Sequence, residues 1–562
     1  MSDTLLRRLP VEQATRRGYG GGRHRLPITY QTRDLVVLGL GVMIGAGIFR
    51  ISGTQAATTA GPAVIVSFLL AGLICLLAAL CYAELSSVVP AAGSAYTFGY
   101  VAFGEPFAWM IGWALILELL LAASVVARAW SLIAAQTLAD FSVTPPPALA
   151  EVIGQERGFD AFALGILALL VLLLATGGRL GLRTLWFMVL AKLIVIALVI
   201  VGGLRFFNAD NLRPFVPEGR PADGEGGQTV LEVLLGGTPQ VFGVWGIIAA
   251  APAIAFAYIG FDLIATAAEE TEDAPRKVPR GILAGLLITI VLYVGVAVAM
   301  VGMISYRELD PARPPLTQAF AEAGAASMGR VIDIGALLGL TTVILVVLIS
   351  MTRVVFSMAR DGLLPRRLAA VGRYRTPSQA TLVAGGAAIV LSQTVDVLTL
   401  EQLVVLGTLF AFLAVSAAVP VLRRSRPDLE RPFRVPGGPL VPVLAIAGVG
   451  WLMLNVQVRT WAYFGLWMLA GLALYLLFGR RNSVLHRITA PPPPAPSHPR
   501  SAAGPPPPPP SSPSPRALPP PWPPAPAPPP PPHGPYGAPP HPDGRHRPPE
   551  PPPPRGGGRH RR

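Results

Sequence analysis

The segment Ile44-Gly45-Ala46-Gly47-Ile48-Phe49 interrupts the first long apolar run of this chain, and Phe256-Ala257-Tyr258-Ile259-Gly260-Phe261-Asp262 interrupts the sixth. Glycine in an apolar helix often serves only close helix packing. Two interruptions at corresponding places in two halves of a chain are instead typical of transporters whose binding site lies at broken helices. An unwound segment exposes amide N–H groups that suit a carboxylate and carbonyl groups that suit an ammonium. The two segments therefore predict a site that fits the backbone of an amino acid.

The composition indicates that this chain lies in a lipid bilayer. Of 562 residues, 52% are hydrophobic and only 14% are charged, whereas a soluble protein carries about 25% charged residues. These values exclude an ordinary cytosolic enzyme and a disordered protein. The apolar residues form continuous runs of about 20 residues, which is the length of a membrane-spanning helix and lacks the alternation of a barrel strand. We therefore expect an all-α membrane protein with twelve transmembrane helices, at about 35–57, 62–89, 106–136, 160–176, 184–206, 243–268, 281–304, 331–359, 379–394, 401–422, 439–457 and 461–479.

The basic charge of the chain lies at its two ends. The formal net charge is +14; residues 1–33 hold seven arginines and two acidic residues, and residues 480–562 hold eleven arginines and two acidic residues. Because the middle is neutral, the charge indicates basic tails beside a membrane and no nucleic-acid partner. Basic residues also gather in alternate loops, at 276–280, 360–375 and 423–434, as expected for cytoplasmic loops. The sequence therefore predicts a multi-pass protein of the plasma membrane with both termini in the cytoplasm.

Three parts follow from this distribution. A basic extension covers residues 1–33, a transmembrane permease domain covers 34–480, and a proline-rich tail covers 481–562. Residues 491–562 hold 35 of the 61 prolines, and such a segment samples polyproline II and cannot form a packed core. The tail is expected to be disordered in the cytoplasm, and the alternative is a docking platform for a proline-recognising partner.

Several further segments, in order along the chain, resemble the amino acid–polyamine–organocation (APC) superfamily, and the cationic amino acid transporters with their bacterial relatives are the most similar branch. The resemblance covers residues 34–480 and implies the APC fold, in which a five-plus-five inverted repeat precedes two C-terminal helices. It does not fix which amino acid is the substrate, and it does not extend to the tail. The segments that carry it are Thr32-Arg33-Asp34-Leu35, Gly45-Ala46-Gly47-Ile48-Phe49, Tyr82-Ala83-Glu84-Leu85, Pro90-Ala91-Ala92-Gly93-Ser94-Ala95-Tyr96, Phe256 to Asp262 with Glu269-Glu270, and Ser357-Met358-Ala359-Arg360-Asp361-Gly362-Leu363-Leu364-Pro365.

The resemblance implies backbone roles for both interrupted segments. The carboxylate of an amino acid would meet the first segment, its ammonium would meet carbonyl groups of the second, and a phenylalanine would act as a hydrophobic gate. Because these are mostly backbone roles, side-chain identity reports on them only weakly. The residues are Ile44, Gly45, Ala46 and Gly47 for the carboxylate, Phe256, Ala257 and Ile259 for the ammonium, and Phe261 for the gate.

Charged residues inside apolar runs form a second set of candidates, because a charge at the bilayer centre costs about 2.5 kcal/mol or more and usually faces a cavity or a partner. Glu118 in the third run and Lys192 in the fifth lie deepest. Glu84 and Arg353 lie nearer the ends of their runs, where packing or gating contacts are expected. Asp262 ends the second interrupted segment, either as a cap of the following half-helix or in contact with substrate.

Two acidic residues also follow the sixth run. Glu269 and Glu270 precede Arg276 and Lys277 in the sequence. The four residues could form an ion pair at the inner mouth of the site, or they could be a solvated run of charges. The sequence leaves both interpretations open.

Lys192 is the candidate for ion coupling. The chain has only two lysines, Lys192 and Lys277, among 45 basic residues. Arginine stays charged when buried, whereas lysine can lose its proton because desolvation disfavours the ammonium. In the resembling family a lysine on helix five stands near the break in helix one, where sodium-coupled relatives hold an ion. We expect Lys192 to contact carbonyl groups between Gly41 and Ile44 and to make transport sodium-independent and proton-linked, with Glu118 as a second proton carrier.

Three functional classes fit these features to different degrees. Secondary transport of amino acids by alternating access is favoured, and if Lys192 stays charged and only braces two helices, the protein is an uncoupled facilitator. A sensor that reports amino-acid binding through its tail shares the same pocket. An enzyme is disfavoured, because the chain has no zinc-binding His pair, no nucleophile elbow and no nucleotide loop. No catalytic residue, cofactor or metal site is predicted, and the substrate side chain stays open between small neutral and cationic amino acids.

Overall fold

The structure, a computed structural model, describes residues 7–19, 30–45, 47–155, 157–176, 182–221, 228–238, 240–310, 314–372, 376–395 and 397–485. Ala46 of the first interrupted segment and the proline-rich tail beyond residue 485 lie outside these residues. The described chain is mainly helical. Its two strands, β1 (Arg220–Pro221) and β2 (Gln240–Val241), form one short antiparallel pair in which Arg220 lies opposite Val241.

The helices follow the predicted apolar runs closely in most places. The α-helices are α1 (Val11–Tyr19), α2 (Thr32–Met43), α3 (Ser52–Gln55), α4 (Val64–Val88), α5 (Ala95–Ala102), α6 (Glu105–Asp140), α7 (Pro147–Ala150), α8 (Ala161–Ala175), α9 (Leu182–Arg205), α10 (Val230–Leu235), α11 (Gly243–Ala257), α12 (Leu263–Thr266), α13 (Ala274–Met303), α14 (Pro315–Glu322), α15 (Ala326–Arg360), α16 (Ser378–Thr394), α17 (Val397–Ser425), α18 (Leu440–Leu454), α19 (Val458–Leu474) and α20 (Arg480–Asn482). The 3-10 and π-helical turns are η1 (Gly47–Ile51), η2 (Ala56–Ala60), η3 (Gly61–Ala63), η4 (Ala209–Leu212), η5 (Ala268–Glu270), η6 (Arg366–Ala369) and η7 (Tyr475–Gly479).

These helices make a multi-pass membrane protein. In the described part of the chain, 7 helical segments are long and apolar enough to span a bilayer, and α8, α11 and α18 are shorter apolar helices. Large side chains such as Leu198, Val291 and Leu466 are exposed on their outer faces, which suits contact with lipid. The buried centre is organised around α6, which packs against α15, α17, α16 and α8.

Both interrupted segments are breaks between helices. Helix α2 ends at Met43, and the helical path resumes with η1 at Gly47. Helix α11 ends at Ala257, and α12 begins at Leu263 after a run of turns. Helix α13 packs against α2, and α12 also packs against α2, so the two broken helices are neighbours inside the bundle.

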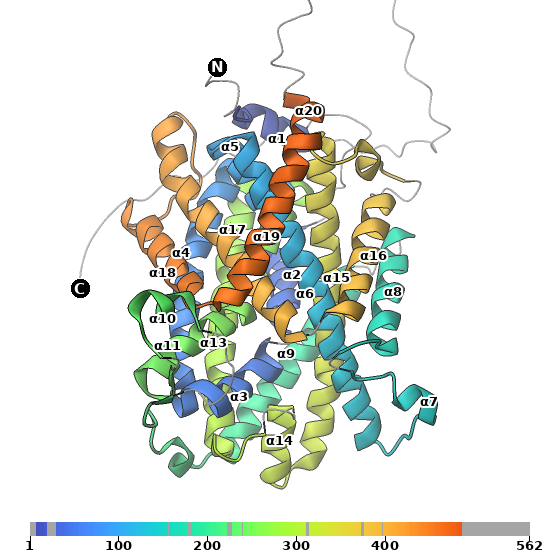
Figure 1. Ribbon diagram of the computed structural model, residues 1–562, viewed down its shortest axis with the longest axis vertical. Coiled ribbons are helices and arrows are strands. Elements are labelled where there is room, and N and C mark those ends of the chain that lie inside the picture. The colour runs from blue at the N-terminus through green and yellow to red at the C-terminus, as the bar shows by residue number, and fades with distance from the viewer. Residues whose placement is uncertain are drawn as a thin grey trace, which may run out of the picture. The chain divides into compact units, whose positions relative to one another are not determined.

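Short helices cover the two ends of the bundle. Helices α1, α5 and α20 lie at one end, and α3, α7 and α14 lie at the other (Figure 1). At the first end, the segment after α19 is held by hydrogen bonds to a side chain and to the backbone of the bundle. The Ser483 hydroxyl donates to Glu105 Oε2 at 2.5 Å, and the Val484 amide donates to the Asp361 carbonyl at 2.9 Å. The chain is therefore docked on the bundle up to Leu485, which is buried.

Candidate functional site

The first break lies against the second with almost no space between their backbones. Gly47 faces Ala257 so closely that a Cβ atom at Gly47 would lie 2.5 Å from the Ala257 Cβ and 2.6 Å from its Cα. A Cβ at Gly45 would lie 2.7 Å from a methyl group of Val343 on α15. Ile44 is fully buried as well. The glycines are thus required by close packing, and the packing brings residues assigned to the carboxylate next to a residue assigned to the ammonium.

The second break contains a backbone conformation that glycine favours. Gly260 has φ +127, and its amide donates to Asp262 Oδ1 at 3.2 Å. The Asp262 side chain makes no cap hydrogen bond to α12, so it stabilises the turn before the helix and does not cap the helix as one interpretation of the sequence expected. Phe256 and Ile259 are half-buried.

Phe261, the predicted gate, is packed among aromatic rings. Its ring lies 5.6 Å from that of Tyr82 in an edge-on arrangement and 4.7 Å from that of Phe412. The side chain is fully buried. The ring therefore joins the second break to α4 and α17.

Lys192 binds the carbonyl groups that the first break leaves without helix partners. Its Nζ donates to the Gly41 carbonyl at 2.7 Å and to the Ile44 carbonyl at 3.0 Å. The third donor reaches Thr342 Oγ1 on α15 at 2.9 Å, and the Thr342 hydroxyl is itself 3.1 Å from the Gly41 carbonyl. The side chain is fully buried, and all three of these partners are neutral oxygens.

Glu118 lies in the middle of α6 with a fully buried side chain. Both carboxylate oxygens have no hydrogen-bond partner among the described residues. The Thr408 hydroxyl on α17 donates to the Val404 carbonyl at 3.0 Å and lies close enough to interact with the Glu118 carboxylate. Asp262 is close enough for the two carboxyl groups to interact electrostatically. Glu118 thus lies near Asp262 of the second break, while Lys192 binds the first.

The charges after α12 are paired with α15, and both expected interpretations were wrong. Arg353 lies 2.6 Å from Glu270 Oε1, and Arg360 lies 3.1 Å from Glu269 Oε1. The expected partners pair elsewhere, Lys277 with Glu272 at 2.8 Å and Arg276 with Asp273 at 3.9 Å. The two glutamates point into the bundle and are largely buried, so they are not a solvated run. Burial raises the pKa of Glu270 above its ordinary value, although the Arg353 guanidinium opposes the shift.

Glu84 has a purely structural environment in this conformation. Its carboxylate accepts from Arg423 Nε at 2.8 Å and from the Val435 amide at 2.7 Å. A second arginine, Arg431, lies 3.6 Å away. Glu84 therefore ties the end of α4 to α17 and the loop that follows it.

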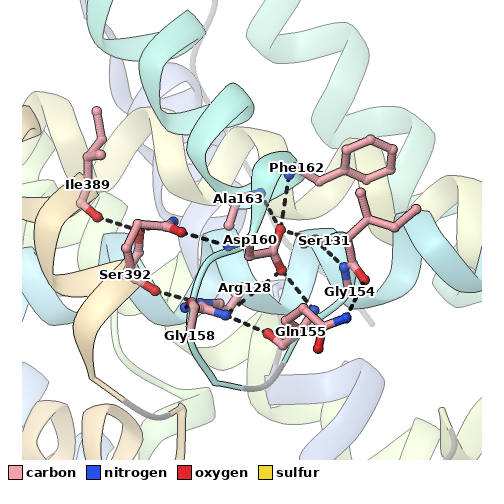
Figure 2. A network of polar contacts seen from close by, with 12 residues as sticks. Arg128, Ser131, Gly154, Gln155, Gly158, Asp160, Phe162, Ala163, Ile389 and Ser392 are labelled. Carbon is pink, nitrogen blue, oxygen red and sulfur yellow. Dashed lines mark hydrogen bonds and ion pairs between the residues drawn. The ribbon is translucent and has the colours of Figure 1, made fainter. Parts of the chain in front are cut away.

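Sequence reasoning missed a buried charged network between α6, α8 and α16 (Figure 2). Arg128, fully buried on α6, donates to the Ser392 carbonyl at 2.5 Å and to the Gln155 carbonyl at 2.6 Å. Its guanidinium lies 4.0 Å from Asp160, whose side chain also caps α8 by accepting from the Phe162 and Ala163 amides. The sequence does contain a signal for this network, because Arg128 is a charged residue inside the third apolar run.

Two uncharged contributors to the site carried no sequence signal. Thr342 and Tyr293 are ordinary residues in apolar helices, and only the structure shows that their hydroxyl groups reach the breaks. In the described part of the chain, no cluster of three or more His, Cys, Asp or Glu side chains could hold a metal ion. The site is built from backbone groups, hydroxyl groups, one ammonium and one unpaired carboxylate.

Comparisons with known proteins identify a family for this chain. Residues 30–478 match the amino acid permease family. The chain is 37% identical to the methylthioribose transporter of Bacillus subtilis over 487 residues, which cover 86% of this chain and 100% of that protein. It is 39% identical to the branched-chain amino acid permease BcaP of Bacillus subtilis over 459 residues, 81% of this chain and 93% of that protein. It is also 34% identical to the human cationic amino acid transporter 4 over 402 residues, 70% of this chain and 59% of that protein.

Proposed function

Because this chain belongs to the amino acid permease family of the APC superfamily, we propose that it is a secondary transporter that moves amino acids across the plasma membrane by alternating access. The proposed architecture has twelve spans, with a five-plus-five inverted repeat followed by two helices and both termini in the cytoplasm. The contact between the two breaks, Gly47 against Ala257, carries the proposal, because it puts free backbone groups of two broken helices at one place.

The substrate lies at these breaks in the proposal. The carboxylate is held by the backbone from Ile44 to Gly47, and the ammonium is held by carbonyl groups of Phe256, Ala257 and Ile259, with Phe261 as the gate. Half-helix ends suit such charges because their unpaired N–H and C=O groups carry partial charges. Glu118 and Asp262 lie beside the second break, where the unpaired Glu118 carboxylate would attract a cationic substrate side chain as well as a proton.

Transport is sodium-independent and proton-linked in this proposal. The ammonium of Lys192 takes the place of a small cation, since it bridges the Gly41 and Ile44 carbonyls and the Thr342 hydroxyl. A buried ammonium with only neutral partners is costly, so loss of its proton would release the carbonyl groups of the break. Glu118 is a second proton carrier in this proposal, because its two buried carboxylate oxygens have no hydrogen-bond partner in the described structure.

Uptake into liposomes tests the proposal. The purified full chain is reconstituted, and uptake of leucine, arginine and methylthioribose is measured without sodium, with and without an imposed pH gradient. We expect sodium-free uptake of an amino acid that the gradient accelerates, and a loss of this acceleration in Lys192→Ala. Lys277→Ala is the matched control, because Lys277 is the only other lysine and its partner is Glu272 outside the site.

Other outcomes separate the alternatives. A strict sodium requirement would refute the replacement of an ion by Lys192, and gradient-insensitive uptake would leave a facilitator. Amino-acid binding without uptake would favour a sensor whose tail contacts a proline-recognising partner. Uptake of methylthioribose alone would refute amino-acid transport.

A further inference from the structure

Tyr293 on α13 is a further side chain that binds carbonyl groups of the breaks, and it reaches both of them. Its hydroxyl is hydrogen-bonded to the Met43 carbonyl and lies 3.0 Å from the Ala257 carbonyl. Met43 is the last residue of α2, and Ala257 is the last residue of α11. The carbonyl groups at a helix end have no partner within the helix, so one phenol group serves the same need on two broken helices.

The ring of Tyr293 is fixed by its surroundings. The side chain is fully buried, and its ring lies 6.0 Å from Phe68 and 5.2 Å from Tyr258. The hydroxyl therefore stays between the two helix ends. Tyr258, by contrast, points its own hydroxyl to the Phe68 carbonyl of α4, at 3.0 Å.

We propose that Tyr293 is a positioning residue that fixes the spacing between the carboxylate-binding break and the ammonium-binding break. The inference rests on the proposed function and adds the selectivity of its site for α-amino acids. Met43 precedes the amides assigned to the carboxylate, and the Ala257 carbonyl is assigned to the ammonium. A single hydroxyl that holds both carbonyl groups sets the distance between these two half-sites, which must match the separation of the two groups on an α-carbon.

The Tyr293 hydroxyl cannot donate to both carbonyl groups at once, and this matters when no substrate is bound. A phenol has one proton to donate, so it satisfies only one of the two carbonyl groups fully at any moment. The ammonium of a substrate can take over the Ala257 carbonyl, and the proton of Tyr293 then serves Met43 alone. When no substrate is bound, the Tyr293 hydroxyl thus gives the buried Ala257 carbonyl a hydrogen-bond partner.

The Tyr293 hydroxyl links the Met43 and Ala257 carbonyls, and this link is called the bridge below. Hydrogen exchange of the full chain in lipid nanodiscs tests the bridge without any substrate. Tyr293→Phe keeps the ring and removes the hydroxyl. We expect amide exchange to rise about tenfold in peptides that cover both breaks, 40–50 and 255–262, because a lost buried hydrogen bond eases local opening. Tyr258→Phe is the matched control, which removes a buried hydroxyl from the same aromatic cluster, and it should raise exchange in 255–262 but not in 40–50. Faster exchange at only one break in Tyr293→Phe, or at both breaks in Tyr258→Phe, would overturn the bridge.

Selectivity tests the positioning. We expect the uptake ratio between the best-transported L-amino acid and its β-homologue to fall about tenfold in Tyr293→Phe, and to stay near the native ratio in Tyr258→Phe. An unchanged ratio in Tyr293→Phe would overturn the role in spacing. Failure of the native chain to take up any amino acid would instead refute the proposed function, while the exchange experiment would still decide the bridge.

A replacement that restores the donor separates hydrogen bonding from packing. Tyr293→4-aminophenylalanine places two N–H donors where the hydroxyl stood, one for each carbonyl. It should restore native exchange and the native selectivity ratio, even if Tyr293→Phe fails to accumulate. If neither variant accumulates, the ring position and not the donor explains the residue, and the proposal is overturned.

Discussion

Replacing Gly47 with alanine tests the contact on which the site depends. The new methyl group would lie 2.5 Å from the Ala257 Cβ and 2.6 Å from its Cα, whereas carbon atoms in contact lie about 3.5–4.0 Å apart. The two backbones must therefore separate by roughly 1 Å. Overpacking of this kind costs about 1–3 kcal/mol, which corresponds to a loss of about 5- to 140-fold in an equilibrium constant. Gly47→Val would cost more, and the effect should fall on substrate binding because the contact joins its two halves.

The assay is substrate binding and uptake by reconstituted protein, together with thermal unfolding to check that the variant folds. Gly386→Ala in α16 is the control, because a Cβ there meets no atom within 4 Å, and it should behave like the native chain. Ala257→Gly should rescue Gly47→Ala only in part, since it removes the Cβ but leaves the Cα in place. Native affinity in a folded Gly47→Ala protein would refute the assignment of the site to these two breaks.

Three further predictions follow from other parts of the chain. A chain that ends after Arg487 should transport like the full chain in the same liposome assay, whereas one that ends after Gly479 loses the docked segment and should unfold at a lower temperature; loss of uptake by the first would favour a function for the tail. Asp160→Asn leaves the buried guanidinium of Arg128 without its countercharge and should lower the free energy of unfolding by about 3–5 kcal/mol, measured by denaturation; an unchanged stability would show that the carbonyl partners suffice. Burial raises the pKa of Glu270 above its ordinary value of 4.5, so folding makes protonation of this carboxyl group easier than in the unfolded chain. The stability advantage of the native chain over Glu270→Gln, followed by thermal unfolding, should therefore be present at pH 4.5 and decline as the pH rises; an advantage that grows with pH would contradict the burial argument.

The sequence predicted the position of both breaks, because glycine and helix-interrupting turns leave a signal in the chain itself. Gly47 and Gly260 stand where the structure places close approach or a positive φ. It also predicted a helical membrane protein of this family, which the comparisons confirm. The count of twelve spans stays a prediction, since the described helices include seven of full spanning length.

The partners of charged residues were harder to predict, because ion pairs depend on which helices are neighbours. Glu269 and Glu270 are only a few residues from basic residues in the sequence, yet their partners lie on α15, 91 and 83 residues away. Hydrogen bonds to backbone carbonyl groups are even harder to predict, since every residue has such a group and the sequence cannot show which of them are unpaired. The role of Tyr293 therefore leaves no trace in the pattern of residue types.

Helix α15 connects the two broken helices at two levels, and this limits how the proposed alternation can occur. At the level of the first break, its Thr342 hydroxyl lies beside the Gly41 carbonyl, which Lys192 of α9 also binds. Toward its other end, Arg353 pairs with Glu270 beyond the second break. A movement that separates α12 from α15 must break buried ion pairs, whereas a movement that separates α9 from α15 must break hydrogen bonds of the Lys192 ammonium. Of these interactions, only the hydrogen bonds of Lys192 depend directly on its proton. In a proton-linked cycle, the release of the first break should therefore precede the opening of the ion pairs between α15 and the segment after α12.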